Sequence, residues 1–406
     1  MLSEEFFAGN RQRLRELFTG TAPIVVTANG LLQRGGDSAY PFHQDANFWY
    51  LTGVDEPDIV LVMDRDKEYL ILPSRDTDRE TFDGSLDDAS LKRRSGVQLI
   101  LEEKEGWKQL GARLQRAKHV ATIAASPGYI ERYGMYTNPA RAQLIQKVKA
   151  ENEQIGLLDL TMHLVRMRMV KQQPEIAAIQ TAIDTTISSI KESLKTSKRG
   201  KYTFEYELEA EITKGFRKRG ARHAYEPIVA SGPRACVLHN IANDSQLVAD
   251  ELVLLDVGAE VEHYAADITR TVSLATPSRR QQAVYAAVLE VQEYAMAHLR
   301  AGAFLQVYEQ KVEHFMGEKL RELGLIKTID HENVRRYYPH ATSHFLGLTV
   351  HDVGDYTLPL AAGNVLTVEP GIYIPEEGIG IRIEDDVLIT ENGIEILSDG
   401  LPRALP

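Results

Sequence analysis

Hydrophobic and polar positions along residues 1–150 follow two different periods. Short runs rich in β-branched residues predict strands at 22–29, 58–64 and 68–74. The stretch 106–117 instead repeats its apolar residues with the period of an amphipathic helix. Strands that alternate with helices in this way are typical of an α/β domain.

The pattern changes near residue 151, where the chain turns strongly helical as far as residue 171. Pro174 and Glu175 then favour the first turn of a new helix. Proline lacks a backbone donor that this turn does not need, and a glutamate interacts favourably with the helix dipole. We therefore predict an α/β domain with a linker helix at 1–170 and a second domain at 171–406.

Helices and strand pairs are interleaved in the second domain. One helix is predicted from Phe204 to Arg219, with Thr203 as its N-cap and Gly220 closing it. Another is predicted over 279–300, and pairs of strands separated by turns follow. This order predicts an α+β domain.

Composition narrows the class of protein. The chain has 406 residues and a formal net charge of −12, which argues against nucleic acid or a membrane surface as its partner. The sequence has no apolar run long enough to cross a membrane, and its first residues lack the pattern of a signal peptide. Cys236 is the only cysteine, so an intrachain disulfide is impossible. We expect a cytoplasmic protein.

Three of the twelve histidines lie within residues 339–354: His340, His344 and His351. A loop facing solvent does not need imidazole, and a packed core avoids so many polar rings. Either His340 or His351 alone would be interpreted as a hydrogen-bonded structural histidine. Together they indicate a functional site.

Four carboxylates interrupt apolar strand patterns elsewhere in the same domain: Asp256, Asp267, Glu369 and Glu384. Acidic residues are depleted in strands and are rarely buried without a partner. Asp256 and Asp267 could instead face solvent on a hairpin, and Glu384 could pair with Arg382 on one strand face. These alternatives explain single residues but not the whole set.

The two aspartates, two glutamates and His344 suit a hard or borderline divalent cation better than structural zinc. Four carboxylates are too many for one ion, so we predict two ions that share ligands. Manganese is the first choice, with cobalt or zinc as alternatives.

This ordered series resembles the two-metal site of the pita-bread metallopeptidases. The segments "HATSHFLGLTVHD", "LTVEPGIYI" and "GIRIEDDVLIT" look like the proline-peptidase branch, which comprises aminopeptidase P and prolidase. The resemblance covers residues 174–390, and residues 34–63 resemble the N-terminal domain of aminopeptidase P. Ala341 stands where the family usually has glycine. We expect a small local backbone adjustment there, without loss of a ligand.

The resemblance implies a role for each residue of the site. Asp256 would bind one ion, Asp267 and Glu384 would bridge both, and His344 and Glu369 would complete the second. Glu369 would also move a proton from the attacking water to the leaving nitrogen. The remaining roles fall to residues around the ions: His340, His351 and His239 would hold substrate or stabilise the oxyanion, and Arg382 would orient its acidic neighbours.

Several functions share this set of ligands. The resemblance favours an Xaa-Pro aminopeptidase, which releases the first residue of peptides with proline in second place. Prolidase, which cleaves Xaa-Pro dipeptides, is the close alternative, because the two share every ligand. A metal-free pita-bread binding protein or a creatine hydrolase would not need all five ligands. A methionine aminopeptidase would not need such a first domain.

Two further features leave alternatives open. Cys236 lies three residues from His239 and is either a thiol nucleophile or, as we favour, an inert buried thiol. Residues 34–50 combine Arg34, Asp37 and His43 with five aromatics. These aromatics could form core, or they could line subunit contacts and the mouth of the site around Asp37 and Trp49. The resemblance implies a homodimer or homotetramer.

Overall fold

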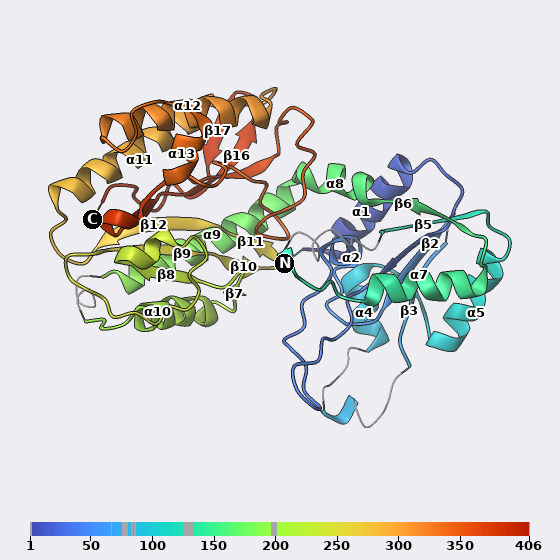
Figure 1. Cartoon of the computed structure of the whole chain (residues 1–406). Helices are drawn as coiled ribbons and strands as arrows, with labels where there is room; N and C mark the ends of the chain where they lie inside the picture. The colour runs from blue at the N-terminus through green and yellow to red at the C-terminus, as the bar shows by residue number, and fades with distance from the viewer. Residues whose placement is uncertain are drawn as a thin grey trace. The chain divides into compact units, whose positions relative to one another are not determined.

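The computed structural model describes residues 2–65, 67–74, 80–82, 84, 87–124, 133–195 and 201–405. The chain divides into two compact units, Met1–Met167 (unit 1) and Arg168–Pro406 (unit 2), which are coloured from blue to red along the sequence in Figure 1. Among the helices of the described ranges, none is long and apolar enough to cross a membrane.

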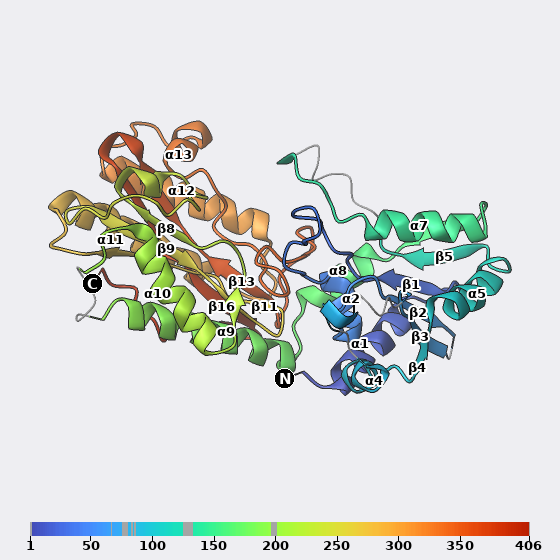
Figure 2. The same cartoon turned by 90° about the horizontal axis from the view of Figure 1, so that it is seen from below.

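Unit 1 is built on one six-stranded mixed sheet with the order β4-β3-β2-β1-β5-β6. Its strands are β1 Ile24–Thr27, β2 Val60–Asp64, β3 Lys67–Ile71, β4 Leu99–Leu101, β5 His119–Thr122 and β6 Gly156–Asp159. Its helices are α1 Glu4–Leu17, α2 Ala46–Thr52, α4 Asp88–Ser95, α5 Glu103–Leu114 and α7 Ala140–Glu151, and α8 Thr161–Met169 begins in unit 1 and ends in unit 2. The group α1, α2 and α4 covers one face, and α5 and α7 cover the other (Figure 2).

This arrangement confirms the predicted α/β class, because the buried strands alternate with covering helices. All four residues of β1 are buried, which explains the continuous apolar run at 24–27. The continuous helix expected from 151 to 171 is wrong, since β6 occupies Gly156–Asp159. Leu157 and Leu158 are exposed on this edge strand. Their apolar side chains therefore do not mark the buried face of a helix.

Unit 2 places strands between two groups of helices. The helices are α9 Gln173–Ser193, α10 Glu205–Lys218, α11 Arg279–His298, α12 Leu305–Glu322 and α13 His331–Tyr337, with short 3-10 turns η1 Gly232–Cys236 and η2 Pro375–Glu377. The first strands are β7 Arg222–His223, β8 Ile228–Ser231, β9 Leu252–Val257, β10 Ala259–Val261, β11 Tyr264–Ala265 and β12 Ile268–Ser273. The later strands are β13 Val365–Val368, β14 Gly371–Ile374, β15 Ile379–Arg382, β16 Asp385–Thr390 and β17 Gly393–Ile396.

The strands of unit 2 form separate antiparallel sheets, which confirms the predicted α+β class. The central ones have the orders β12-β9-β8 and β13-β16-β17, and β14 pairs with β15. Helices α9 and α10 lie on one side of these strands, whereas α11, α12 and α13 lie on the other (Figure 1). All residues of β9 and β12 are buried, so these two strands are covered on both faces.

Helix starts follow the predicted chemistry in one case and depart from it in another. Pro174 lies in the first turn of α9, where Glu175 Oε2 accepts a hydrogen bond from the Gln172 amide at 2.9 Å. Thr203 is not the N-cap of α10, because the helix begins at Glu205 after Phe204. The Glu207 carboxylate accepts the amides of both Thr203 and Phe204 and so performs the capping.

Trp49 is fully buried in unit 1, where its ring packs edge-on against Phe7 with centroids 5.2 Å apart. The expectation that Trp49 lines the mouth of a site is therefore wrong. Phe48 and Tyr50 are also fully buried, but Tyr40 is 54% exposed. The aromatic run thus divides into core residues on α2 and exposed residues before it.

We expect Trp49→Ala to lower the free energy of unfolding of unit 1 by about 3–5 kcal/mol, because it leaves a large cavity in the core. Trp107, the second of the two tryptophans, lies in α5 and reports the unfolding of unit 1 by fluorescence. Tyr40→Ala is the control and should change the same free energy by less than about 0.5 kcal/mol. Equal effects of the two substitutions would contradict the placement of Trp49.

Candidate metal centre

Asp256 and Asp267 are brought together by the antiparallel pair of β9 and β12. Asp256 lies within β9 opposite Thr269, and Asp267 immediately precedes β12. Both aspartates are buried. The hydroxyl of Tyr225 lies 2.6 Å from Asp256 Oδ1 and 2.6 Å from Asp267 Oδ1. Because that hydroxyl has one proton, it donates to one of the two carboxylates at a time.

Glu384 reaches the same place from the connection between β15 and β16. The sequence pattern predicted that Glu384 and Asp267 lie inside strands. This prediction is wrong, because each residue lies just outside the end of a strand. The Glu384 amide donates to the carbonyl oxygen of Thr269 at 3.0 Å, and the Thr269 hydroxyl donates to the Glu384 carboxylate. These contacts hold Glu384 against β12.

His344 lies between Asp267 and Glu369, which follows β13. Its Nε2 atom is 3.4 Å from Asp267 Oδ2 and 3.3 Å from Glu369 Oε1. Its Nδ1 atom contacts the carbonyl oxygen of Phe345 at 3.0 Å, so Nδ1 carries a proton and Nε2 faces the carboxylates. Ligand atoms of Asp267, His344 and Glu384 all lie within 4.8 Å of one another.

The electrostatics of the cluster show how strongly these groups interact. Burial raises the pKa of Glu369 to about 8, and the positive charge of His344 only partly opposes it. Burial and repulsion from Asp267 raise the pKa of Glu384 well above its ordinary value. Burial opposes the charged form of His344, but the hydrogen bond to Asp267 and the charge of Glu369 raise its pKa to about 9. So many carboxylates require positive charge beside them.

Arg382 supplies one such charge. Its guanidinium forms a buried ion pair with Asp256 and donates to the Tyr373 hydroxyl at 2.8 Å. The Tyr373 hydroxyl in turn lies 2.8 Å from His340 Nε2. Arg382 therefore pairs with Asp256 and not, as the alternative held, with Glu384 on its own strand face.

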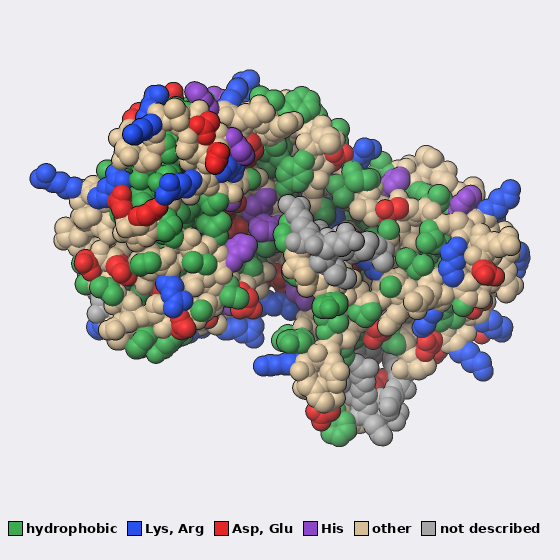
Figure 3. Space-filling view, viewed as in Figure 1, with side chains coloured by type: hydrophobic (Ala, Val, Ile, Leu, Met, Phe, Trp, Pro, Cys, Tyr) green, Lys and Arg blue, Asp and Glu red, His purple; other side chains and the backbone are tan. Residues whose placement is uncertain are grey.

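The other histidines surround this cluster. His351 packs edge-on against His344, with ring centroids 4.4 Å apart. Burial and the charge of Arg382 lower the pKa of His340 to about 3, and His239 adds to this effect. Burial likewise lowers the pKa of His351, with contributions from His344 and His239. Figure 3 shows histidine side chains gathered together on the surface of unit 2.

Two hydroxyl groups of the site were missed by the sequence reasoning. Tyr225 lies between β7 and β8, and its two carboxylate partners lie 31 and 42 residues away in the sequence, so no local pattern indicated its role. Tyr373 lies in the segment "PGIYI", two residues after Gly371 on β14. Its hydroxyl could have been suspected, because a tyrosine in an apolar strand needs a polar partner when it is buried.

The chemistry of the donor set fits divalent cations. Four carboxylates and one imidazole converge from two antiparallel sheets and their connections. Oxygen ligands with a single nitrogen are the set that manganese and related ions prefer. Burial first, and repulsion between the carboxylates second, raise the pKa values of Glu369 and Glu384, and bound cations would oppose both effects.

Comparisons with known proteins identify the family of the chain. Residues 175–391 match the family model "Metallopeptidase family M24", which spans more than half of the chain. The chain belongs to metallopeptidase family M24. Residues 7–122 match the model "Aminopeptidase P, N-terminal domain". The two-part resemblance inferred from the sequence is therefore confirmed.

Individual relatives match nearly the whole chain. An Xaa-Pro aminopeptidase of Haemophilus influenzae is 33% identical over 432 residues, covering 100% of this chain and 96% of the relative. Aminopeptidase P of Escherichia coli in its low-pH form is 31% identical with a TM-score of 0.89, covering 100% of this chain and 97% of that one. A zinc-substituted complex of the Escherichia coli protein with product has a TM-score of 0.87 at 31% identity, covering 99% of this chain and 96% of that one. Unit 2 thus has the pita-bread fold of the M24 family.

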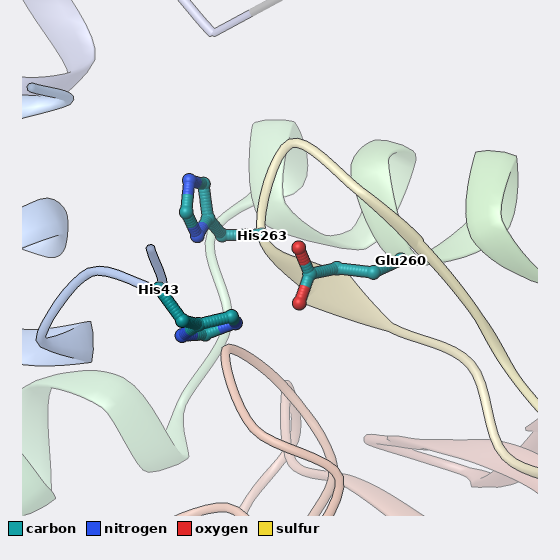
Figure 4. Close-up of side chains that lie close together, drawn as sticks. All are labelled: His43, Glu260 and His263. Carbon is teal, nitrogen blue, oxygen red and sulfur yellow. The ribbon is translucent and has the colours of Figure 1, made fainter. Parts of the chain in front are cut away.

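Another carboxylate close to a histidine in unit 2 is found on the β10–β11 hairpin, where Glu260 lies near His263. Glu260 and His263 offer ligand atoms within 4.8 Å of each other, and Figure 4 shows both side chains on this hairpin. The third residue that Figure 4 labels, His43, belongs to unit 1. Glu260 already accepts a hydrogen bond from Arg222 Nε at 2.6 Å. Both residues are buried, and within unit 2 the Glu260 carboxylate is already ion-paired with Arg222.

Cys236 is half-buried, and its thiol donates to the Ile379 carbonyl oxygen at 3.4 Å. Burial raises the pKa of this thiol to about 11. At neutral pH the thiolate that a nucleophile needs is scarce. This agrees with the interpretation of Cys236 as an inert thiol.

We expect Asp267→Asn and Glu384→Gln each to lower metal affinity by more than about 100-fold, the upper range for residues that only support a ligand. His351→Ala should leave metal affinity nearly unchanged, because its ring packs on His344 without lying among the carboxylates. Metal content of the purified variants, measured by mass spectrometry, checks both. Loss of metal from His351→Ala, or its retention by Glu384→Gln, would contradict this set.

Proposed function

We propose that the protein is an Xaa-Pro aminopeptidase, a metal-dependent hydrolase that removes the first residue from peptides with proline in second place. The observation that carries the proposal is the convergence of Asp256, Asp267, His344, Glu369 and Glu384 in a chain of the M24 family. The full-length similarity to Xaa-Pro aminopeptidases supports the substrate class.

Two divalent ions fit the proposed ligand set. Manganese is the preferred ion, with cobalt or zinc as alternatives, and the zinc-substituted relative supports a divalent ion. When bound, such ions polarise a carbonyl oxygen and lower the pKa of water. We assign Asp256 to one ion, Asp267 and Glu384 to both, and His344 and Glu369 to the other.

Proton transfer falls to Glu369 in this proposal. Burial raises the pKa of its carboxyl group to about 8 without metal, and bound ions would lower that value, so Glu369 would start as a carboxylate able to accept a proton. Its amide donates to the Thr342 carbonyl oxygen at 2.9 Å, which fixes the start of its side chain. Glu369 would take a proton from the water that attacks the scissile carbonyl and would give it to the leaving proline nitrogen.

The remaining site residues act on substrate or on the ligands. Arg382 holds the Asp256 carboxylate in place through their ion pair. His340, kept neutral by the burial that lowers its pKa to about 3, presents an imidazole that Tyr373 orients. We propose that His340, His351 and His239 contact the substrate carbonyl and frame the proline ring.

An Xaa-Pro bond explains the need for such a site. Proline has no backbone N–H, so a peptidase that grips its substrate as a β-strand lacks a donor at this position. A site that grips the carbonyl oxygen and the free amino terminus does not need that donor. Imidazole rings and apolar walls can then select the proline ring by shape.

Prolidase remains the alternative function, since the proposed ligands are common to both enzymes. The match of residues 7–122 to the aminopeptidase P N-terminal domain favours the aminopeptidase. The domain limits 1–170 and 171–406, the cytoplasmic location and the homo-oligomeric state remain predictions.

We expect cleavage of Ala-Pro-Ala after addition of manganese, with release of alanine, and loss of this activity after chelation. Ala-Pro alone should be cleaved much more slowly, and Ala-Ala-Ala should resist. Release of alanine is followed by chromatography. Full activity in the absence of any metal would contradict the two-metal proposal. Cleavage of Ala-Pro without cleavage of Ala-Pro-Ala would identify a prolidase.

The homo-oligomer is tested separately by sedimentation. Tyr40 and its exposed neighbours Leu31 and Leu32 offer apolar surface on the segment that precedes α2. We expect a dimer or tetramer, and we expect Tyr40→Asp to weaken the association. A monomer at micromolar concentration would contradict the oligomer.

A further inference from the structure

The segment between His340 and His344 belongs to no helix and has no strand of its own before Phe345. It nevertheless carries one proposed metal ligand and one proposed substrate residue. The backbone donors of such a segment need acceptors when they are buried. Thr342 and Ser343 are both buried, so partners outside the segment decide its conformation.

Most of these partners come from a single carboxylate, that of Glu309 on α12. The Thr342 amide donates to Glu309 Oε2 at 2.9 Å and to Oε1 at 3.1 Å. The Thr342 hydroxyl donates to Oε2 at 2.9 Å, and the Ser343 amide donates to Oε1 at 3.1 Å. Each oxygen of Glu309 thus accepts two donors from this short segment.

The contacts continue from this segment into the metal centre. Ser343 directly precedes His344 in the chain. The hydrogen bond from the Ser343 amide to Glu309 therefore helps to fix the backbone from which the His344 side chain extends. The Thr342 carbonyl oxygen accepts the Glu369 amide at 2.9 Å. Glu309 therefore reaches two members of the proposed ligand set through one pair of residues.

We infer that Glu309 is a positioning residue that sets His344 and Glu369 at the spacing that a metal ion requires. It acts through Thr342 and Ser343, and the inference rests on the proposed metal-dependent function. Other groups support the same segment: the Tyr308 hydroxyl lies 3.0 Å from Ser343 Oγ, and Arg335 donates to the His340 carbonyl oxygen at 2.6 Å. Among the described residues, only Glu309 accepts the backbone amides of Thr342 and Ser343, whereas the His344 amide donates to the Thr367 hydroxyl oxygen at 3.2 Å.

Glu309→Gln is the sharpest substitution because it keeps the size of the side chain. A glutamine has only one acceptor oxygen, and its amide group would point two donors at the donors of Thr342 and Ser343. The segment would have to shift to separate them. We expect the affinity for cobalt, measured by visible absorbance without any peptide, to fall by about 10- to 100-fold.

The kinetic readout separates positioning from substrate binding. Glu309 touches no group proposed to contact peptide, so kcat should fall at saturating metal while KM stays within about twofold. Glu205→Gln is the matched control. Glu205 is a buried carboxylate of unit 2 that accepts the Ser231 amide at 2.7 Å, the Ser231 hydroxyl at 2.9 Å and the Ser245 amide at 3.0 Å. It should lower thermal stability without changing the cobalt spectrum.

Thr342→Val provides a second variant if Glu309→Gln fails to fold. It removes the hydroxyl contact with Glu309 and keeps the backbone amides. We expect a smaller loss of cobalt affinity in the same direction, and in the double variant a loss smaller than the sum of the two.

Cobalt affinity of Glu309→Gln equal to that of the unsubstituted protein, or lowered no more than in Glu205→Gln, would overturn the inference. So would additive losses in the double variant. A protein that binds cobalt in a Glu309-dependent manner but cleaves no Xaa-Pro peptide would instead refute the proposed function and leave the positioning role intact.

Discussion

Mutual repulsion among buried carboxylates is the constraint on which the organisation of unit 2 depends. Asp256 lies within β9, and Asp267, Glu369 and Glu384 lie beside the ends of neighbouring strands; all of them are buried except Glu369, which is partly buried. Charges close together in a medium of low dielectric interact by several kcal/mol. A fold that brings them together must hold each one by its backbone and must surround them with positive charge.

The structure meets this constraint from several directions. Arg382 pairs with Asp256, and the protonated form of His344 is favoured by Asp267 and Glu369. Arg270 on β12 donates to the carbonyl oxygens of Glu384, Leu401 and Pro402 and to the Asp385 carboxylate, which ties the backbone of Glu384 to β12 and to the last residues. These contacts position the carboxylates but leave an excess of negative charge, and two divalent ions would balance it.

The sequence indicated that Asp256, Asp267, Glu369 and Glu384 belong to one site, because each carboxylate stands among apolar residues that favour strands, and the structure brings Asp267 and Glu384 together with His344. The classes of both units were predictable for the same reason, since buried strands such as β9 leave long apolar runs. Tyr225 and Glu309 could not be predicted, because the partners that give them their roles lie 31 or more residues away in the sequence. Trp49 was misjudged because a count of aromatic residues does not distinguish a buried ring from an exposed one.

A calorimetric titration with manganese near pH 7.5, repeated in buffers of different ionisation enthalpy, tests the central claim most directly. Divalent ions lower the pKa values of groups that bind them, so Glu369 (about 8) and His344 (about 9) should lose protons as metal binds. The account predicts two ions per chain and a release of protons to the buffer, both abolished in Glu384→Gln. Binding of manganese without proton release, or no binding at all, would contradict it.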